Sequence, residues 1–180
     1  MSLRLFFALW PDPPLQEAMG RVAADIARNA GGRATATPKI HLTLAFLGNV
    51  EPDVCRCVEA AAATIEAAAF TLALDRIGSF RVGVVWLGAS APSEPLVALQ
   101  AALADRVGRC GIALEVRPFA PHLTLVRKSR QRVSTGLAPI EWRVDRFRLV
   151  ASERRREGSD YRCLREYALS TPSLPLHAGL

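Results

Sequence analysis

The tetrapeptide His-Leu-Thr-Leu occurs twice in the chain, at residues 41–44 and 122–125, and this duplication restricts the fold more than any other feature. Shifting the chain by the 81 residues between the two copies also superposes an apolar run, Leu3–Phe6 on Val84–Leu87. Both runs are typical of strands that end in proline-containing turns. The spacing therefore indicates an internal repeat of a strand-containing unit.

A helix is predicted between each apolar run and each tetrapeptide, because apolar residues recur there at helical spacing. They are Leu15, Met19, Val22 and Ile26 in the first copy, and Leu96, Leu99, Leu103 and Val107 in the second. The first of these residues precedes the histidine by 26 positions in both copies. We therefore predict two similar units, residues 3–80 and 84–170, related by a pseudo-two-fold axis.

The chain after each tetrapeptide is less alike in the two units. The predicted elements are a third helix at about residues 52–69 and strands at about residues 70–80, 142–151 and 161–169. A polar stretch covers residues 128–139. Because no linker rich in Gly and Ser separates the units, we expect residues 1–180 to form a single domain of two packed lobes. Residues 172–180 are predicted to be a loose tail.

Charge and hydrophobicity exclude some classes of protein. The chain has no apolar run near the ~20 residues that span a bilayer, and its first residues lack a secretory cleavage site, so we expect a cytoplasmic protein without a membrane partner. The net charge is +6, and residues 127–165 hold twelve Lys or Arg against five Asp or Glu. A polyanionic partner would explain this excess, but 21 of the 23 basic residues are Arg, and codon usage in a GC-rich genome would explain that equally well.

The four cysteines, at positions 55, 57, 110 and 163, are too few for a disulfide scaffold in a chain of this length. The Cys-x-Cys pair also lacks the spacing of a zinc or redox motif. We predict that all four are reduced thiols.

Alternation along a strand makes the tetrapeptide a candidate for chemistry. His41 and Thr43 would share one face of their strand, about 7 Å apart, while the leucines between and after them anchor the other face in a core. His122 and Thr124 repeat this pattern. If a pseudo-two-fold axis relates the units, two imidazoles and two hydroxyls meet across a cleft and can surround one phosphate.

Such a group of side chains suits the opening of a cyclic phosphodiester. The reaction needs a base for the attacking water and an acid for the leaving oxygen, and histidine can act as either near neutral pH. Threonine hydroxyls can donate hydrogen bonds to the non-bridging oxygens. No metal is needed, in keeping with a sequence that lacks a carboxylate cluster, and no cofactor is expected.

Paired histidines and the residues around them also have other uses in proteins. A catalytic zinc normally has three protein ligands, and no third ligand stands at repeat-related spacing. The third histidine, His177, is expected to be exposed and inactive. Arg127 could neutralise a phosphate, but strict alternation places it on the face opposite His122, so this role requires a bulge or a strand end. A last set of candidates, for stacking on a base, comprises Phe6, Phe7 and Trp10, although aromatic residues in a first strand are more often core.

These motifs resemble those of the two-histidine (2H) phosphoesterase superfamily, specifically the RNA 2′,3′-cyclic phosphodiesterases, also called 2′-5′ RNA ligases. The signature of that family is His-x-Thr-x, twice. Its context is matched by Arg4–Leu9, by His41–Gly48, by Pro118-Phe119-x-Pro121 and by Arg127. Lys39 departs from the pattern, because relatives often have an acidic or amide residue there, and the basic stretch after Arg127 is a second departure.

The resemblance implies a bilobal α+β fold with antiparallel sheets lining a central cleft and helices packed outside. It implies hydrolysis of RNA 2′,3′-cyclic phosphate ends to 2′-phosphomonoesters, with His41 as proton donor, His122 as proton acceptor, and Thr43, Thr124 and Arg127 binding the phosphate. The expected partner is RNA or a related cyclic nucleotide, and a monomer is expected. Two alternatives stay open: a reversible 2′-5′ RNA ligase, and a non-catalytic nucleotide- or RNA-binding module.

Overall fold

A computed structural model describes residues 2–80, 83–91, 93–114, 118–155 and 158–171. Its helices are α1 (Pro13–Ala30), α2 (Pro52–Ala63) and α3 (Glu94–Arg109), with a 3₁₀ turn η1 (Thr37–Lys39). Its strands are β1 (Leu3–Leu9), β2 (Arg33–Ala34), β3 (Leu42–Val50), β4 (Phe70–Phe80), β5 (Val84–Gly88), β6 (Leu123–Arg127), β7 (Thr135–Val144), β8 (Arg146–Arg155) and β9 (Gly158–Ala168).

All the strands belong to one open antiparallel sheet in the order β7-β4-β5-β6-β3-β1-β8-β9, with β2 added beside β6. The order has a natural midpoint between β6 and β3. We call β7, β4, β5 and β6 the β6 half, and β3, β1, β8 and β9 the β3 half. The predicted α+β class, with antiparallel strands, is confirmed, and the two sheets of the prediction are halves of one continuous sheet.

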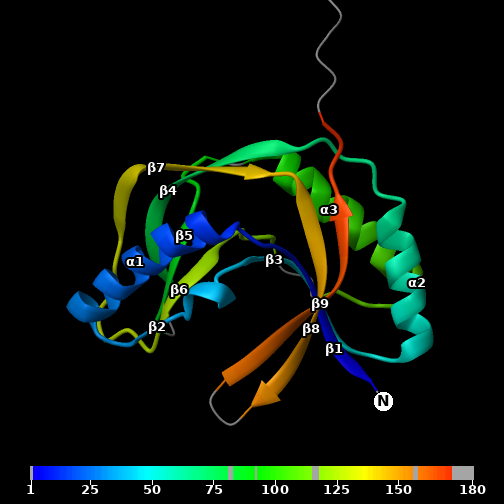
Figure 1. The fold of residues 1–180 in the computed structure, drawn as a ribbon, viewed down its shortest axis with the longest axis horizontal. Coiled ribbons are helices and arrows are strands. Elements are labelled where there is room, and N and C mark those ends of the chain that lie inside the picture. Colours follow the sequence, from blue (N-terminus) through cyan, green and yellow to red (C-terminus); the bar gives the residue numbers. More distant parts are fainter. Residues whose placement is uncertain (1, 81–82, 92, 115–117, 156–157, 172–180) are drawn as a thin grey trace, which may run out of the picture.

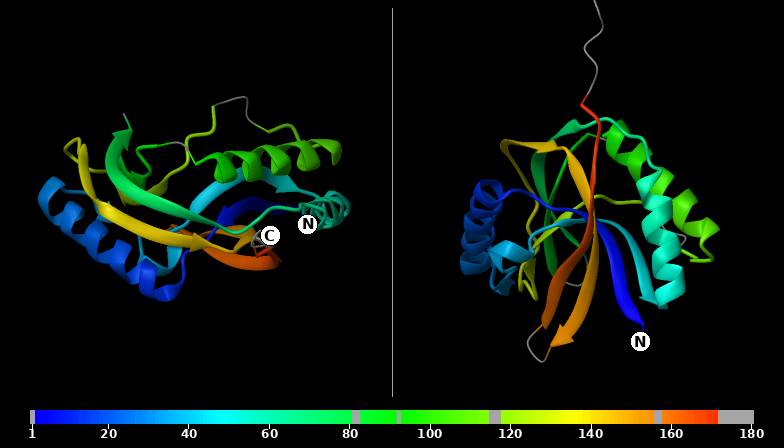
Figure 2. Two further views of the ribbon diagram at one scale, coloured as in Figure 1. Left: turned by 90° about the horizontal axis from the view of Figure 1, so that it is seen from above. Right: turned by 45° about the vertical axis from the view of Figure 1, so that its right-hand side comes forward.

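The helices pack on opposite halves of the sheet. Helix α1 contacts β6, whereas α3 contacts β3, and α2 lies beside α3 and touches β9. Figures 1 and 2 show α1 at one end of the molecule and the α2–α3 pair at the other. Because α1 connects two strands of the β3 half and α3 connects two strands of the β6 half, the halves are interlocked.

The predicted units do not map one to one onto the two halves. Unit 3–80 supplies β1 and β3 to one half and β4 to the other, and unit 84–170 likewise supplies strands to both. The division into repeat units stays a prediction. Since neither half is built from one continuous segment, we propose a single domain. Both the predicted tail, residues 172–180, and His177 lie outside the described residues.

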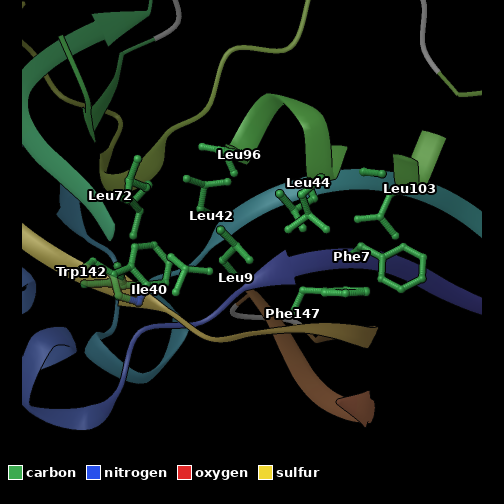
Figure 3. Packing of buried hydrophobic residues seen from close by; sticks show 14 of the residues in the cluster. Phe7, Leu9, Ile40, Leu42, Leu44, Leu72, Leu96, Leu103, Trp142 and Phe147 are labelled. Atoms are coloured by element: carbon green, nitrogen blue, oxygen red, sulfur yellow. The ribbon is translucent and has the colours of Figure 1, made fainter. Parts of the chain in front are cut away.

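Alternation on β1 divides its side chains between two environments. Leu5, Phe7 and Leu9 are fully buried in the main core, where they meet β3, β8 and α3. Figure 3 shows the same core with Phe7 and Leu9 facing leucines of β3 and α3. Phe6 and Ala8 point the other way and form a small separate cluster with Val150 of β8. The sheet thus has a helix-covered face and a second face that is partly open.

The boundaries of several elements differ from the predicted ones. The helix predicted at about residues 52–69 is α2, which ends at Ala63. The strand predicted at residues 142–151 comprises the end of β7 and the start of β8, which are separated at Asp145. At this break the backbone oxygen of Asp145 accepts from the Leu169 N–H, and its carboxylate accepts from Arg146. The last strand was predicted well.

The prediction of four reduced cysteines is wrong for two of them. Cys57 of α2 and Cys110, just after α3, form a disulfide with a Cα–Cα distance of 5.8 Å. Their 53-residue separation gave no local signal, because only the packing of α2 against α3 brings them together. Cys55 and Cys163 are free thiols.

Among the described residues, no helix is long and apolar enough to cross a bilayer.

Candidate active site

The two tetrapeptides meet at the midpoint of the sheet. Strands β3 and β6 pair there through Leu42 and Leu123, both almost completely buried, and each leucine directly follows a motif histidine. By the same antiparallel register, His41 lies across from Thr124, and Thr43 across from His122. Since alternation puts these four side chains on the face opposite the leucines, the sequence repeat becomes a two-fold arrangement in space.

One cavity of about 810 Å³ collects these side chains on the open face of the sheet. The predicted site residues that line it are His41, Thr43, His122, Thr124 and Arg127. The structure therefore brings together every residue that the sequence singled out for catalysis or phosphate binding. Their roles stay predictions.

Both imidazoles are oriented by the same contact. The Nδ1 atom of His41 lies 2.7 Å from the backbone oxygen of Lys39, and Nδ1 of His122 lies 2.8 Å from that of Ala120, two residues earlier in each case. A carbonyl oxygen can only accept, so Nδ1 carries the hydrogen in both rings. In the neutral tautomer this leaves Nε2 of each ring free to accept a proton.

His41 is enclosed by aromatic side chains. Trp10 stacks on its ring at a centroid distance of 4.7 Å, Phe6 lies at 5.2 Å, and the ring of Tyr161 meets it edge-on at 5.2 Å. Burial in this group lowers the pKa of His41 to about 4, because desolvation disfavours the imidazolium. The Lys39 backbone hydrogen bond opposes this shift, and the nearby Arg127 and His122 charges add to it.

His122 has fewer aromatic neighbours. Phe80 of β4 meets its ring edge-on at a centroid distance of 5.0 Å, and that phenylalanine is itself 37% exposed. No other aromatic ring among the described residues contacts it. The two imidazoles thus make the same backbone contact but have unequal surroundings.

Arg127 reaches the cavity because β6 contains a bulge. Thr124 pairs with Trp86 while Val126 pairs with Val85, so one extra residue of β6 stands between the two pairs. As a result Leu125 and Val126 are both fully buried, and the alternation after them is reversed. The bulge that the phosphate-binding role of Arg127 required is present.

Some lining residues were not anticipated from the sequence. Further cavity residues are Arg4 and Phe46 from the β3 half, Tyr161 and Ser152 from the β8–β9 hairpin, and Arg33 beside Arg127. Alternation relative to Phe6 could have indicated Arg4. Nothing local connects Tyr161 with the tetrapeptides, because its approach depends on the pairing of β8 with β1.

Two of the three aromatic residues considered for base stacking lie by the site. Phe6 lines the cavity and Trp10 stacks on His41, whereas Phe7 belongs to the main core. Lys39, the departure from the family pattern, also lines the cavity. Its ammonium donates to the Ser159 backbone oxygen at 2.8 Å and lies 3.1 Å from the Asp160 carboxylate, which links η1 to β9.

The polar side chains that line this site carry imidazole, hydroxyl, guanidinium and ammonium groups. Among the described residues, no group of three or more His, Cys, Asp or Glu side chains is placed to hold a metal ion. The side chains can exchange protons through two imidazoles and donate hydrogen bonds to an anion, which is the chemistry that a phosphate ester requires.

Comparison with known proteins agrees with this geometry. Residues 11–156 match the family described as the 2′-5′ RNA ligase superfamily. The RNA 2′,3′-cyclic phosphodiesterase of Escherichia coli K12 is 35% identical over 170 residues, 93% of this chain and 97% of the relative. The enzyme of the same name from Thermus thermophilus is 29% identical over 182 residues, covering 93% of this chain and 90% of its own.

Solved structures show the same likeness. The crystal structure of E. coli LigT complexed with 3′-AMP superposes with a TM-score of 0.86 at 34% identity, covering 95% of this chain and all of that one. A T. thermophilus structure, TT0787, has a TM-score of 0.81 at 24% identity and supports the fold alone.

Proposed function

Because the chain belongs to the 2′-5′ RNA ligase superfamily, we propose that it hydrolyses RNA 2′,3′-cyclic phosphodiester ends to 2′-phosphomonoesters, using two histidines and no metal ion. The observation that carries this proposal is that His41 and His122 line one cavity with Nδ1 of each held by a carbonyl. Each ring therefore has Nε2 available for proton transfer to or from the same substrate.

In the proposed reaction, the cyclic phosphate lies between the two imidazoles. His122 accepts a proton from water as the water oxygen attacks phosphorus, and His41 donates a proton to the 3′-oxygen as the bond from phosphorus to that oxygen breaks. The product is a 2′-phosphomonoester with a free 3′-hydroxyl. The histidines finish with their protonation exchanged and return to the starting state through solvent.

The donor role requires that substrate binding raises the pKa of His41. In the empty site, burial keeps this imidazole neutral at pH 7. A phosphate anion beside the ring would favour its charged form by attraction and by a hydrogen bond from Nε2. The low pKa thus couples protonation of His41 to the presence of the substrate.

Phosphate binding falls to the remaining predicted residues. Thr43 and Thr124 stand across from the opposite histidine in the central register and can donate to the non-bridging oxygens. Arg127 can pair with the same phosphate, since its guanidinium is always charged and presents several donors.

Because the cavity is completed within one chain, we also propose a monomer. Binding of RNA favours a cytoplasmic location, although the Cys57–Cys110 disulfide is of a kind that is uncommon in reducing compartments.

Phosphorus NMR of the product tests the proposal. An oligoribonucleotide ending in a 2′,3′-cyclic phosphate is incubated with the protein in the presence and absence of EDTA. We expect a 2′-monoester and an unchanged rate with EDTA. A 3′-monoester, or loss of activity with EDTA that added metal restores, would contradict the proposed mechanism.

The same substrate separates the alternative functions. A 5′-hydroxyl RNA added to the reaction would be joined through a 2′-5′ linkage by a reversible ligase, because its hydroxyl then replaces water as the nucleophile. Tight binding with no turnover would indicate a binding module instead. The imidazoles argue against pure binding, since Arg or Lys would hold a phosphate more strongly near neutral pH.

A further inference from the structure

A second hollow adjoins the catalytic cavity on the β3 half of the sheet. It has a volume of about 550 Å³ and is lined by Ser2, Arg4, Gly48, Asn49, Ser152 and Arg154. Arg4 and Ser152 also line the catalytic cavity. The two hollows therefore adjoin at these two side chains, which a ligand in either one can contact.

The strand register explains how this hollow forms. Arg4 precedes Phe6 by two residues on β1, so it points to the same open face about 7 Å further along the strand. On the adjacent strand β8, Ser152 and Arg154 alternate onto that face as well, and Asn49 of β3 pairs with Arg4. A path thus runs outward from the aromatic residues around His41 to two guanidiniums.

The two guanidiniums differ from their neighbours in charge balance. Arg155 is paired with Glu153 and Asp160, and Arg146 and Arg148 share Glu166. For Arg4 and Arg154 no ion pair is found within the described part of the chain. None of the described residues that line either hollow is an Asp or a Glu. The positive charges of Arg4 and Arg154 are therefore available to bind an anionic ligand.

The walls between the reacting site and the guanidiniums are aromatic. Phe46 is 59% exposed although it is a large apolar side chain, and it lies 5.7 Å from Phe6 between ring centroids. Tyr161 contacts Phe6 from the other side at 5.4 Å. Aromatic faces beside a positively charged groove are the combination that binds single-stranded nucleic acid.

We propose that Arg4 and Arg154 form a second phosphate subsite, which binds the internucleotide phosphodiester next to the cyclic end. This inference rests on the proposed function and narrows its substrate class. The preferred substrate is an RNA chain of two or more nucleotides rather than a free cyclic mononucleotide, because only a chain carries a phosphodiester that reaches the second hollow.

Three substrates test the subsite through their kcat/KM values. They are adenosine 2′,3′-cyclic phosphate, its 5′-(methyl phosphate) derivative, and an ApA dinucleotide that ends in a 2′,3′-cyclic phosphate. The wild-type protein should prefer the second and third over the first by about tenfold or more, the usual effect of a hydrogen bond to a charged group. A preference for the dinucleotide alone would assign the gain to its second base and overturn the subsite.

Variants that remove one positive charge show which residues cause the preference for the longer substrates. Arg4→Gln and Arg154→Gln should each lower the ratio of the dinucleotide to the mononucleotide value by about threefold to tenfold, and the double variant should bring it near one. Arg162→Gln is the matched control. Arg162 is an exposed arginine on β9 that pairs with Ala151, whose side chain faces the main core, so it points to the opposite face.

The outcomes distinguish this inference from the proposed function. Equal values for all three substrates, or a ratio that survives both substitutions, would overturn the subsite while hydrolysis itself stands. An equal loss on every substrate would also overturn it, since a phosphate subsite acts only on the longer ones. Failure to hydrolyse any of the three would refute the proposed function, and the subsite with it. Thermal unfolding of each variant verifies that the fold is intact.

Discussion

The two histidine motifs have the same sequence and the same backbone contact but different neighbours. His41 lies among Trp10, Phe6 and Tyr161, whereas His122 meets Phe80 alone among the described aromatic residues. The tetrapeptide therefore sets the orientation of each imidazole, and tertiary packing sets which aromatic side chains surround it. Two copies of one motif thus have unequal surroundings without any change in their own residues, and the proposed mechanism gives them different roles.

The difference comes from Phe6 and Trp10, whose counterparts in the second unit are not aromatic. The residue 81 positions after Trp10 is Ala91, so the second unit has no indole to stack on its histidine. Tyr161 stands 81 positions after Phe80, and these two rings make the same edge-on contact with His41 and His122, respectively. The residue 81 positions after Phe6 is Leu87, so the two units diverge at two of the three aromatic contacts on His41.

The largest expected effect is on catalysis by His41→Ala and His122→Ala. Each should lower kcat by roughly 10²- to 10⁴-fold, because each removes one proton transfer. A substrate with sulfur in place of the leaving 3′-oxygen then separates the roles of the two histidines, since a thiolate leaves without a proton. That substrate should restore much of the activity of His41→Ala but little of His122→Ala. The reverse pattern would exchange the two roles.

Loss of the disulfide should have the next largest effect. It links α2 to α3, the helices on the β3 half, whereas the β6 half is covered by α1 without a cross-link. Cys57→Ser should lower the free energy of unfolding by about 2–4 kcal/mol, as expected when a loop of this length loses its cross-link. Denaturant unfolding measures the loss, and Cys163→Ser, which removes an exposed free thiol, is the matched control. Equal stability of both variants would show that the cross-link contributes nothing.

Acid pH should weaken the fold through His41 specifically. Its pKa is about 4 in the folded protein and about 6.5 in the unfolded chain, so the unfolded state binds more protons between these values. Stability is therefore lost as pH falls below about 6.5, by roughly 2 kcal/mol between pH 7 and pH 5 for this one group. Denaturant unfolding of wild type and His41→Gln at both pH values isolates the contribution.

Trp10→Leu tests the cause of that shift. Opening the aromatic group to water should raise the pKa of His41 toward its ordinary value, which NMR titration of the ring protons measures directly. The pH-dependent loss of stability should then shrink with it. If the pKa of His41 stayed near 4 in this variant, burial by Trp10 would not be its cause.

The sequence predicted those parts of the molecule that depend on local pattern. Helix α3 and its buried face, the strands of both motifs and the convergence of His41 and His122 all follow from periodicity and from the repeat. The bulge that turns Arg127 into the cavity, and the meeting of Cys57 with Cys110, depend on pairing and packing between distant segments. No residue pattern near them carries that information.

The proposed mechanism requires both histidines to act on the same phosphate, and a double variant tests this directly. Single-turnover rates are measured for His41→Ala, His122→Ala and the variant with both changes, on one cyclic-phosphate RNA. Residues that act as a unit are strongly non-additive, so we expect the double variant to be about as slow as the slower single one. A rate reduced by the product of the two single losses would mean that the histidines act independently, and would contradict the shared site.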